Sequence, residues 1–92
     1  MSFVFMVFHW PEPGNHDALA QSMREMAGAL TAMPGCLAVD PPYRTEDGSC
    51  LVGILRWESR QAFLASGITL RSAAEIVAGE TRPRQRFLLD EV

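Results

Sequence analysis

The sequence has 92 residues, of which 48% are hydrophobic and 21% charged, a balance typical of a folded domain and not of a disordered chain. All eight basic residues are arginine, so no lysine is present for Schiff-base chemistry or for a phosphate-binding loop ending in Gly-Lys-Ser/Thr. The net charge of -3 opposes binding to a phosphate backbone, so we expect no nucleic-acid partner. The length predicts a single domain over residues 1–92.

The first ten residues are strongly apolar, yet they are too few to span a bilayer and lack the basic start and cleavage site of a signal peptide. We interpret Phe3 to His9 as a strand of a cytoplasmic protein with no membrane partner. Apolar residues occupy both faces of this strand, as Phe5 and Met6 illustrate, so both faces must be covered.

A helix is predicted after this strand. Pro11 to Gly14 breaks the strand, Asn15 is a suitable N-cap, and Pro34-Gly35 ends the helix. Between these limits apolar residues recur at helical spacing, at Leu19, Met23, Met26, Leu30 and Met33.

The next two strands form a predicted hairpin. Cys36 to Tyr43 is expected at the edge of a sheet, because Pro41-Pro42 cannot donate hydrogen bonds to a neighbouring strand. Thr45 to Ser49 forms the turn, and Cys50 to Trp57 forms the second strand. This register separates the two cysteine sulfurs, so we expect no disulfide, as suits a reducing compartment.

A second helical region in two parts is predicted next. Ser59 caps a short helix through Phe63 that ends at Gly67, and Thr69 caps a further helix that ends at Gly79. The further helix would present one apolar side, formed by Leu70, Ala73, Ala74 and Val77.

Arg84 to Leu89 is predicted as the last strand. Phe87 and Leu89 are expected to face the helices, and the arginines of the alternate positions to face the other way. Those arginines are Arg82, Arg84 and Arg86.

The resulting order is βαββαβ, which predicts an α+β, ferredoxin-like fold with a four-stranded antiparallel sheet. Its helices would all pack on one face of the sheet. The other face is also apolar, and no chain remains to cover it. We therefore expect a homodimer that forms through the sheet faces.

Two short motifs make the chain similar to the antibiotic biosynthesis monooxygenase family of dimeric α+β barrels. They are Met33-Pro-Gly-Cys-Leu37 and Leu55-Arg-Trp-Glu-Ser-Arg-Gln-Ala-Phe63. The resemblance implies a homodimer with a small-molecule pocket in each subunit, and oxygenation of an aromatic substrate by molecular oxygen without metal or flavin. The haem-degrading branch has an asparagine in its first strand and a histidine after its second helix, which this sequence lacks, so we do not expect haem degradation.

Few polar residues are candidates for this chemistry. His9 is the candidate base, because histidine exchanges protons near neutral pH. Arg84 and Arg86 are candidates for holding a carboxylate, enolate or phenolate of the substrate. Salt bridges across the dimer are the alternative role for these arginines, with Glu46, Asp47, Glu80 or Glu91 as partners.

Two aromatic residues are candidates for flanking the substrate ring. Trp57 matches the tryptophan of the family motif, and Tyr43 ends the preceding strand. Packing alone also explains Trp57, because buried aromatic residues stabilise a core. No metal site is expected, because His9 and His16 lack the spacing of two ligands on one helix.

Two functions remain open at this point. The first is a cofactor-independent monooxygenase that acts on a small phenol, quinol or anthrone-like substrate. The second is a non-catalytic dimeric module of the same fold that binds a small molecule. An oxygenase requires a proton acceptor and an anion-stabilising donor at one buried cavity, whereas a binding module requires only apolar volume.

Overall fold

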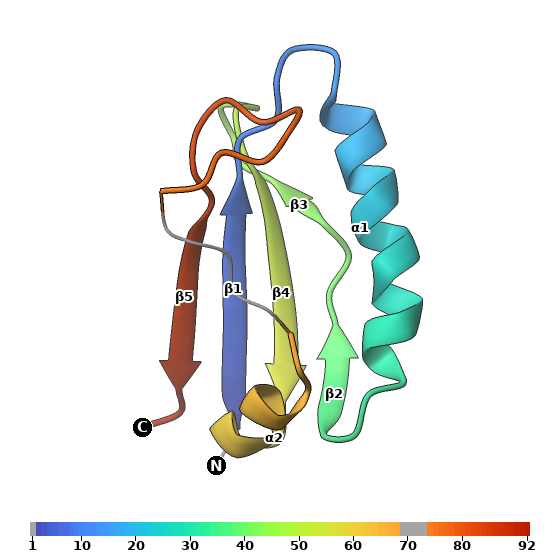
Figure 1. Ribbon diagram of the computed structural model, residues 1–92, viewed down its shortest axis with the longest axis vertical. Helices are drawn as coiled ribbons and strands as arrows, with labels where there is room; N and C mark the ends of the chain where they lie inside the picture. The colour runs from blue at the N-terminus through green and yellow to red at the C-terminus, as the bar shows by residue number, and fades with distance from the viewer. Residues whose placement is uncertain (1, 69–73) are drawn as a thin grey trace.

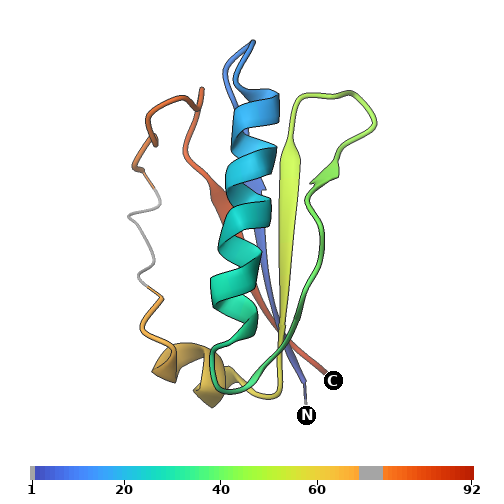
Figure 2. The ribbon, with the colours of Figure 1, turned by 90° about the vertical axis from the view of Figure 1, so that its right-hand side faces the viewer.

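The computed structural model describes residues 2–68 and 74–92. These residues form two helices and one antiparallel sheet of five strands (Figure 1, Figure 2). Neither helix is long and apolar enough to cross a membrane. The architecture is the predicted α+β, ferredoxin-like fold. Its elements are β1 (Phe3–His9), α1 (His16–Thr31), β2 (Cys36–Val39), β3 (Tyr43–Arg44), β4 (Leu51–Trp57), α2 (Arg60–Ala65) and β5 (Gln85–Asp90).

The sheet has the strand order β2, β4, β1, β5, and β3 also pairs with β4. The predicted strand from Cys36 to Tyr43 does lie at an edge, but it is divided into two. Pro41 and Pro42 fall between β2 and β3, and the chain leaves the ladder there because proline cannot donate a hydrogen bond. Cys36 pairs with Trp57, as expected from the hairpin register.

An aromatic core forms on the helix-facing side of the sheet, at the end near α2. Phe63 of α2 lies against Phe5, with ring centroids 4.9 Å apart, and meets Trp57 edge-on at 5.6 Å. Ser59 precedes α2, and its Oγ accepts a hydrogen bond from the backbone amide of Ala62 at 3.1 Å. The predicted capping residue therefore sets the start of the helix that closes this core.

α1 runs in front of the sheet, roughly parallel to its strands (Figure 2). It begins at His16, directly after Asn15, but the Asn15 side chain makes no capping hydrogen bond. Its Nδ2 instead donates to the carbonyl oxygen of Gly79 at 3.0 Å. Gly79 has a φ of +86°, and a Cβ at this residue would lie 2.5 Å from Asn15 Nδ2, so the contact requires glycine.

The second part of the predicted helical region is not confirmed. Residues 69–73, which include the expected cap Thr69 as well as Leu70 and Ala73, lie outside the described residues. Over 74–79 the chain forms turns and irregular structure instead of a helix. One of these turns is closed by a hydrogen bond from the backbone amide of Glu80 to the carbonyl oxygen of Val77 at 3.0 Å.

β5 faces the opposite way from the prediction. Phe87 and Leu89 are 39% and 41% exposed on the face away from the helices. Arg86 lies on the helix-facing side instead, opposite Val7 of β1, and Leu88 packs against the core. The expectation that Arg86 points away from the helices is therefore wrong.

The sheet face away from α1 is apolar, and none of the described elements covers it. Phe8 and Phe87 meet edge to face there, with ring centroids 5.8 Å apart. The strand registers place further apolar residues on this face, namely Val4, Met6, Val52, Ile54 and Leu89. A continuous apolar surface of this kind is typical of a contact surface.

Candidate functional site

A cavity of about 510 Å³ lies between α1 and the helix-facing side of the sheet. Most of its lining is apolar and comes from β1, α1 and β4, including Phe5, Val7, Leu19, Met23, Met26, Leu30 and Leu55. Gly53 in β4 leaves room for it, because a Cβ there would lie 3.2 Å from both Met23 Cε and Val7 Cγ1. A cavity of this size and polarity suits a small organic molecule.

Polar groups gather at the β1–β5 side of this cavity. His9, Arg84 and Arg86 all line it. The sequence predicted these three as site residues, and the fold brings them together because His9 ends β1 beside the start of β5. The cavity therefore combines an apolar body with a basic end.

Trp57 and Tyr43, the two predicted aromatic residues, do not line the cavity. Trp57 pairs with Phe3 at the start of β1, whereas His9 is at its end, which places Trp57 and His9 roughly 20 Å apart along the strand. Trp57 is 0% exposed and packs on Phe63. Tyr43 is 47% exposed in the short edge strand β3.

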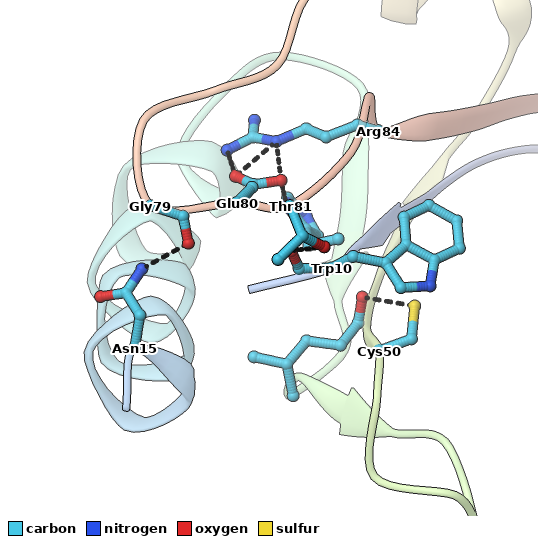
Figure 3. A network of polar contacts seen from close by, with 9 residues as sticks. Trp10, Asn15, Cys50, Gly79, Glu80, Thr81 and Arg84 are labelled. Atoms are coloured by element: carbon cyan, nitrogen blue, oxygen red, sulfur yellow. Dashed lines mark hydrogen bonds and ion pairs between the residues drawn. The ribbon is translucent and has the colours of Figure 1, made fainter. Parts of the chain in front are cut away.

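Glu80 is a member of the site that the sequence did not identify as one. Its carboxylate is buried and accepts three hydrogen bonds from Arg84, of which the shortest joins Arg84 Nη2 to Glu80 Oε2 at 2.7 Å (Figure 3). The pair lies within one chain, not across a dimer interface. The sequence had named Glu80 as one possible salt-bridge partner of Arg84 and Arg86, but nothing in it indicated that this carboxylate is buried beside His9.

The segment that carries Glu80 is fixed to the end of β1. The backbone amide of Thr81 donates to the carbonyl oxygen of Trp10 at 2.8 Å, and the amide of Glu12 donates to the carbonyl oxygen of Gly79 at 2.8 Å. Figure 3 shows this segment together with the contact between Asn15 and Gly79. These contacts position Glu80 independently of its side-chain pairing.

His9 is buried, and no hydrogen bond engages its Nδ1 among the described residues. The nearest carboxylate oxygen, Glu80 Oε1, lies 3.8 Å away, which is too far for a hydrogen bond. The pKa of His9 is lowered from 6.5 to about 4, mainly by burial; the nearby charges of Arg84 and Arg86 also lower it, and Glu80 opposes the shift. His9 is therefore neutral at pH 7 and can accept a proton.

The charges around the cavity favour an anion. Arg84 and Arg86 supply two guanidinium groups, and Glu80 supplies one carboxylate. Asp40 lines the β2 side of the cavity, but both of its oxygens accept hydrogen bonds from Arg56 at 3.1 Å. Among the described residues at the basic end, guanidinium groups outnumber carboxylates, an arrangement that suits a carboxylate, enolate or phenolate.

The remaining reactive groups do not form a second site. Cys36 and Cys50 are free thiols, and burial raises the pKa of each, which reduces the thiolate needed for nucleophilic attack. Within residues 2–68 and 74–92, no three His, Cys, Asp or Glu side chains lie close enough together to hold a metal ion.

The chain is similar to one protein family and to several solved structures. The sequence model of the family described as antibiotic biosynthesis monooxygenase matches residues 1–67. Rv0793 from Mycobacterium tuberculosis is 26% identical, with a TM-score of 0.80 over 100% of this chain and 96% of that chain. A Nitrosomonas europaea protein named for the same family has a TM-score of 0.77 at 14% identity, over 99% and 90% of the two chains.

A haem-degrading protein also shares the fold. Rv3592 from Mycobacterium tuberculosis is 22% identical, with a TM-score of 0.68 over 95% of this chain and 92% of that chain. An identity this low concerns the fold alone. No curated protein matches the sequence significantly.

The lowered pKa of His9 predicts a loss of stability in acid. Its pKa is about 4 in the folded protein and 6.5 without these neighbours, so the unfolded chain binds more protons between these values. The contribution of His9 to the free energy of unfolding is fully present above pH 6.5. Up to about 3 kcal/mol of that free energy is lost as the pH falls towards 4. Urea unfolding of the wild type at several pH values measures this slope.

The matched variants separate His9 from other acid-titrating groups. His9→Gln should flatten the dependence between pH 6.5 and 4, whereas His16→Gln, at the start of α1, should keep that of the wild type. An unchanged slope in His9→Gln would contradict the placement of His9 as a buried neutral imidazole.

Proposed function

This chain belongs to the antibiotic biosynthesis monooxygenase family, and on that premise we propose that it is a cofactor-independent monooxygenase of small aromatic substrates. The observation that carries the proposal is the meeting of His9, Arg84 and Arg86 at one end of an otherwise apolar cavity. An oxygenase of this type needs a proton acceptor and an anion-stabilising donor within reach of one substrate. The volume of about 510 Å³ suits an aromatic compound with a few fused rings.

The reaction begins with proton transfer to His9. An anthrone-like substrate with an acidic ring methylene loses one proton to the imidazole, and Arg84 and Arg86 hold the resulting enolate. The enolate gives its electrons to molecular oxygen, and a carbon–oxygen bond forms to give a hydroperoxide, whose proton returns from His9. Loss of water then leaves a carbonyl, so R₂CH₂ and O₂ become R₂CO and H₂O. The reduced substrate supplies all four electrons that reduce O₂, and no metal or flavin takes part.

A non-catalytic binding module is the second candidate. The observation in its favour is the low proton affinity of the resting His9, because a base with a pKa of about 4 accepts a proton from a weak acid only when the resulting anion is stabilised. Such a module would bind the same aromatic anions and consume no oxygen. The two candidates therefore make opposite predictions for turnover.

Oxygen consumption tests the choice directly. We expect the wild type to consume one O₂ per molecule of anthrone or quinol oxidised. His9→Gln should lower kcat about 100-fold or more, because a general base contributes at least that much. Arg86→Ala should raise KM about tenfold through the loss of one charge-assisted contact.

The controls change the same residue types outside the cavity. His16→Gln and Arg82→Ala should retain wild-type turnover, since His16 starts α1 and the Arg82 guanidinium lies over the Trp10 ring, 4.7 Å from its centroid. Wild-type protein that turns over no member of a panel of anthrones and quinols would favour the binding module. Unchanged turnover in both cavity variants would refute the assigned roles.

We also propose a homodimer in which the two apolar sheet faces cover each other. Support comes from the face that carries Phe8 and Phe87, which is apolar and left uncovered by the described elements. Burial of such a face in a second copy removes it from water without any further chain.

Sedimentation equilibrium at micromolar concentration tests this assembly. The wild type should have twice the 10.2 kDa mass of one chain, and Phe87→Glu should shift it towards monomer because a buried charge disfavours the contact. Leu64→Glu, at a 60% exposed position of α2, should remain dimeric. A wild-type monomer would refute the dimer.

A further inference from the structure

The Glu80 carboxylate is costly to bury, and the proposed reaction does not by itself require it. Its side chain is 2% exposed, and Arg84 satisfies both of its oxygens. A buried ion pair is weak evidence of a gain in stability, because apolar residues of similar volume often replace such pairs without loss. The position of Glu80 beside His9 therefore calls for a role within the site.

The His9 side of this arrangement has a buried nitrogen without a hydrogen bond among the described residues. This nitrogen, His9 Nδ1, lies 3.8 Å from Glu80 Oε1. A proton gained by His9 would place an imidazolium directly beside this carboxylate. Catalytic hydrogen bonds are often long before the ligand binds and shorten in the complex.

Among the described residues, few other charges face His9. Arg84 and Arg86 come from the segment before β5 and from β5 itself. α1 contributes only uncharged side chains to the cavity, of which Ser22 is polar, and Asp40 on the β2 side is paired with Arg56. Glu80 is thus the negative group among the described residues that can stabilise a proton on His9.

We propose that Glu80 is a positioning residue that makes the cavity bind an aromatic anion together with one proton, which His9 takes up. The anion offsets part of the positive field of Arg84 and Arg86, so these arginines oppose protonation of His9 less strongly. Glu80 stabilises the imidazolium and keeps Arg84 in place. An ionised substrate with its proton on His9 has the same composition as the neutral substrate, so this complex is the state that follows proton transfer in the proposed reaction.

Removal of the Glu80 charge should separate binding from proton uptake. In Glu80→Gln the site keeps both guanidinium groups and loses its carboxylate, so it becomes more positive by one charge. The anion should then bind roughly 3- to 10-fold more tightly, because the opposing charge is gone. Proton uptake by His9 should fall, so kcat should decrease while KM also decreases. Loss of a merely structural residue would weaken binding instead.

Calorimetric titration with 2-naphthoate tests the inference without any need for turnover. Near pH 6, in two buffers with different ionisation enthalpies, the wild type should take up at least about a third of a proton per naphthoate bound. Glu80→Gln should bind naphthoate more tightly with several-fold less proton uptake. Glu25→Gln removes the same charge from the exposed side of α1 and should match the wild type.

The outcomes are decisive in either direction. Wild-type binding without proton uptake, no binding of naphthoate, or equal uptake in Glu80→Gln would each overturn the inference. If Glu80→Gln does not fold, Glu80→Gln/Arg84→Gln removes the pair together and should also lose proton uptake by His9; uptake equal to that of the wild type would overturn the inference. The inference rests on the proposed function only where it identifies the proton-linked complex with the state that follows proton transfer in the reaction. Proton-linked binding without oxygen consumption would refute the oxygenase alone.

Discussion

The buried ion pair between Glu80 and Arg84 determines how the last strand sits on the sheet. Arg84 must turn towards the helix side to satisfy Glu80, whose segment is already fixed to the end of β1 by backbone hydrogen bonds. Side chains alternate along a strand, so Arg86 follows Arg84 to the same side, and Phe87 takes the other face. One electrostatic requirement thus makes the cavity basic and the opposite sheet face more apolar.

The cavity itself results from uneven packing between α1 and the sheet. Near α2 the space is filled by Phe63, which contacts Phe5 and Trp57. Further along the strands Gly53 contributes no side chain, and Met23 and Val7 border the space that remains. A rigid aromatic cluster therefore fills one end of the layer, while the polar groups stand at the other end. This separation suits a planar apolar ligand that lies with its charged group towards β5.

Local patterns in the sequence predicted most of the fold. The apolar residues of β1, the helical spacing in α1 and the Ser59 cap depend on residues near one another, and the structure confirms each of them. The facing of β5 could not be predicted in this way. Phe87, Leu88 and Leu89 are consecutive apolar residues, so either face was an acceptable choice for the strand.

The site was predicted only in part, because local sequence patterns do not reveal which distant residues the strand pairing brings together. His9 could be placed at the end of its strand from local sequence, but its nearness to Arg84 and Arg86 depends on the pairing of β1 with β5. Glu80 lies in an irregular segment between α2 and β5, where no helical or strand spacing of apolar residues indicates which side chains are buried. Trp57 left two interpretations open, and only the antiparallel register of β1 and β4 places it at the far end from His9.

The central claim is that aromatic anions bind beneath α1 with the anionic group at the β5 end. A crystal structure of the protein with 2-naphthoate tests it most directly. The account predicts the naphthoate carboxylate within hydrogen-bond distance of Arg84 or Arg86, and its rings over Gly53. Naphthoate bound on the open sheet face beside Phe8 and Phe87, or with its carboxylate turned away from both arginines, would contradict it.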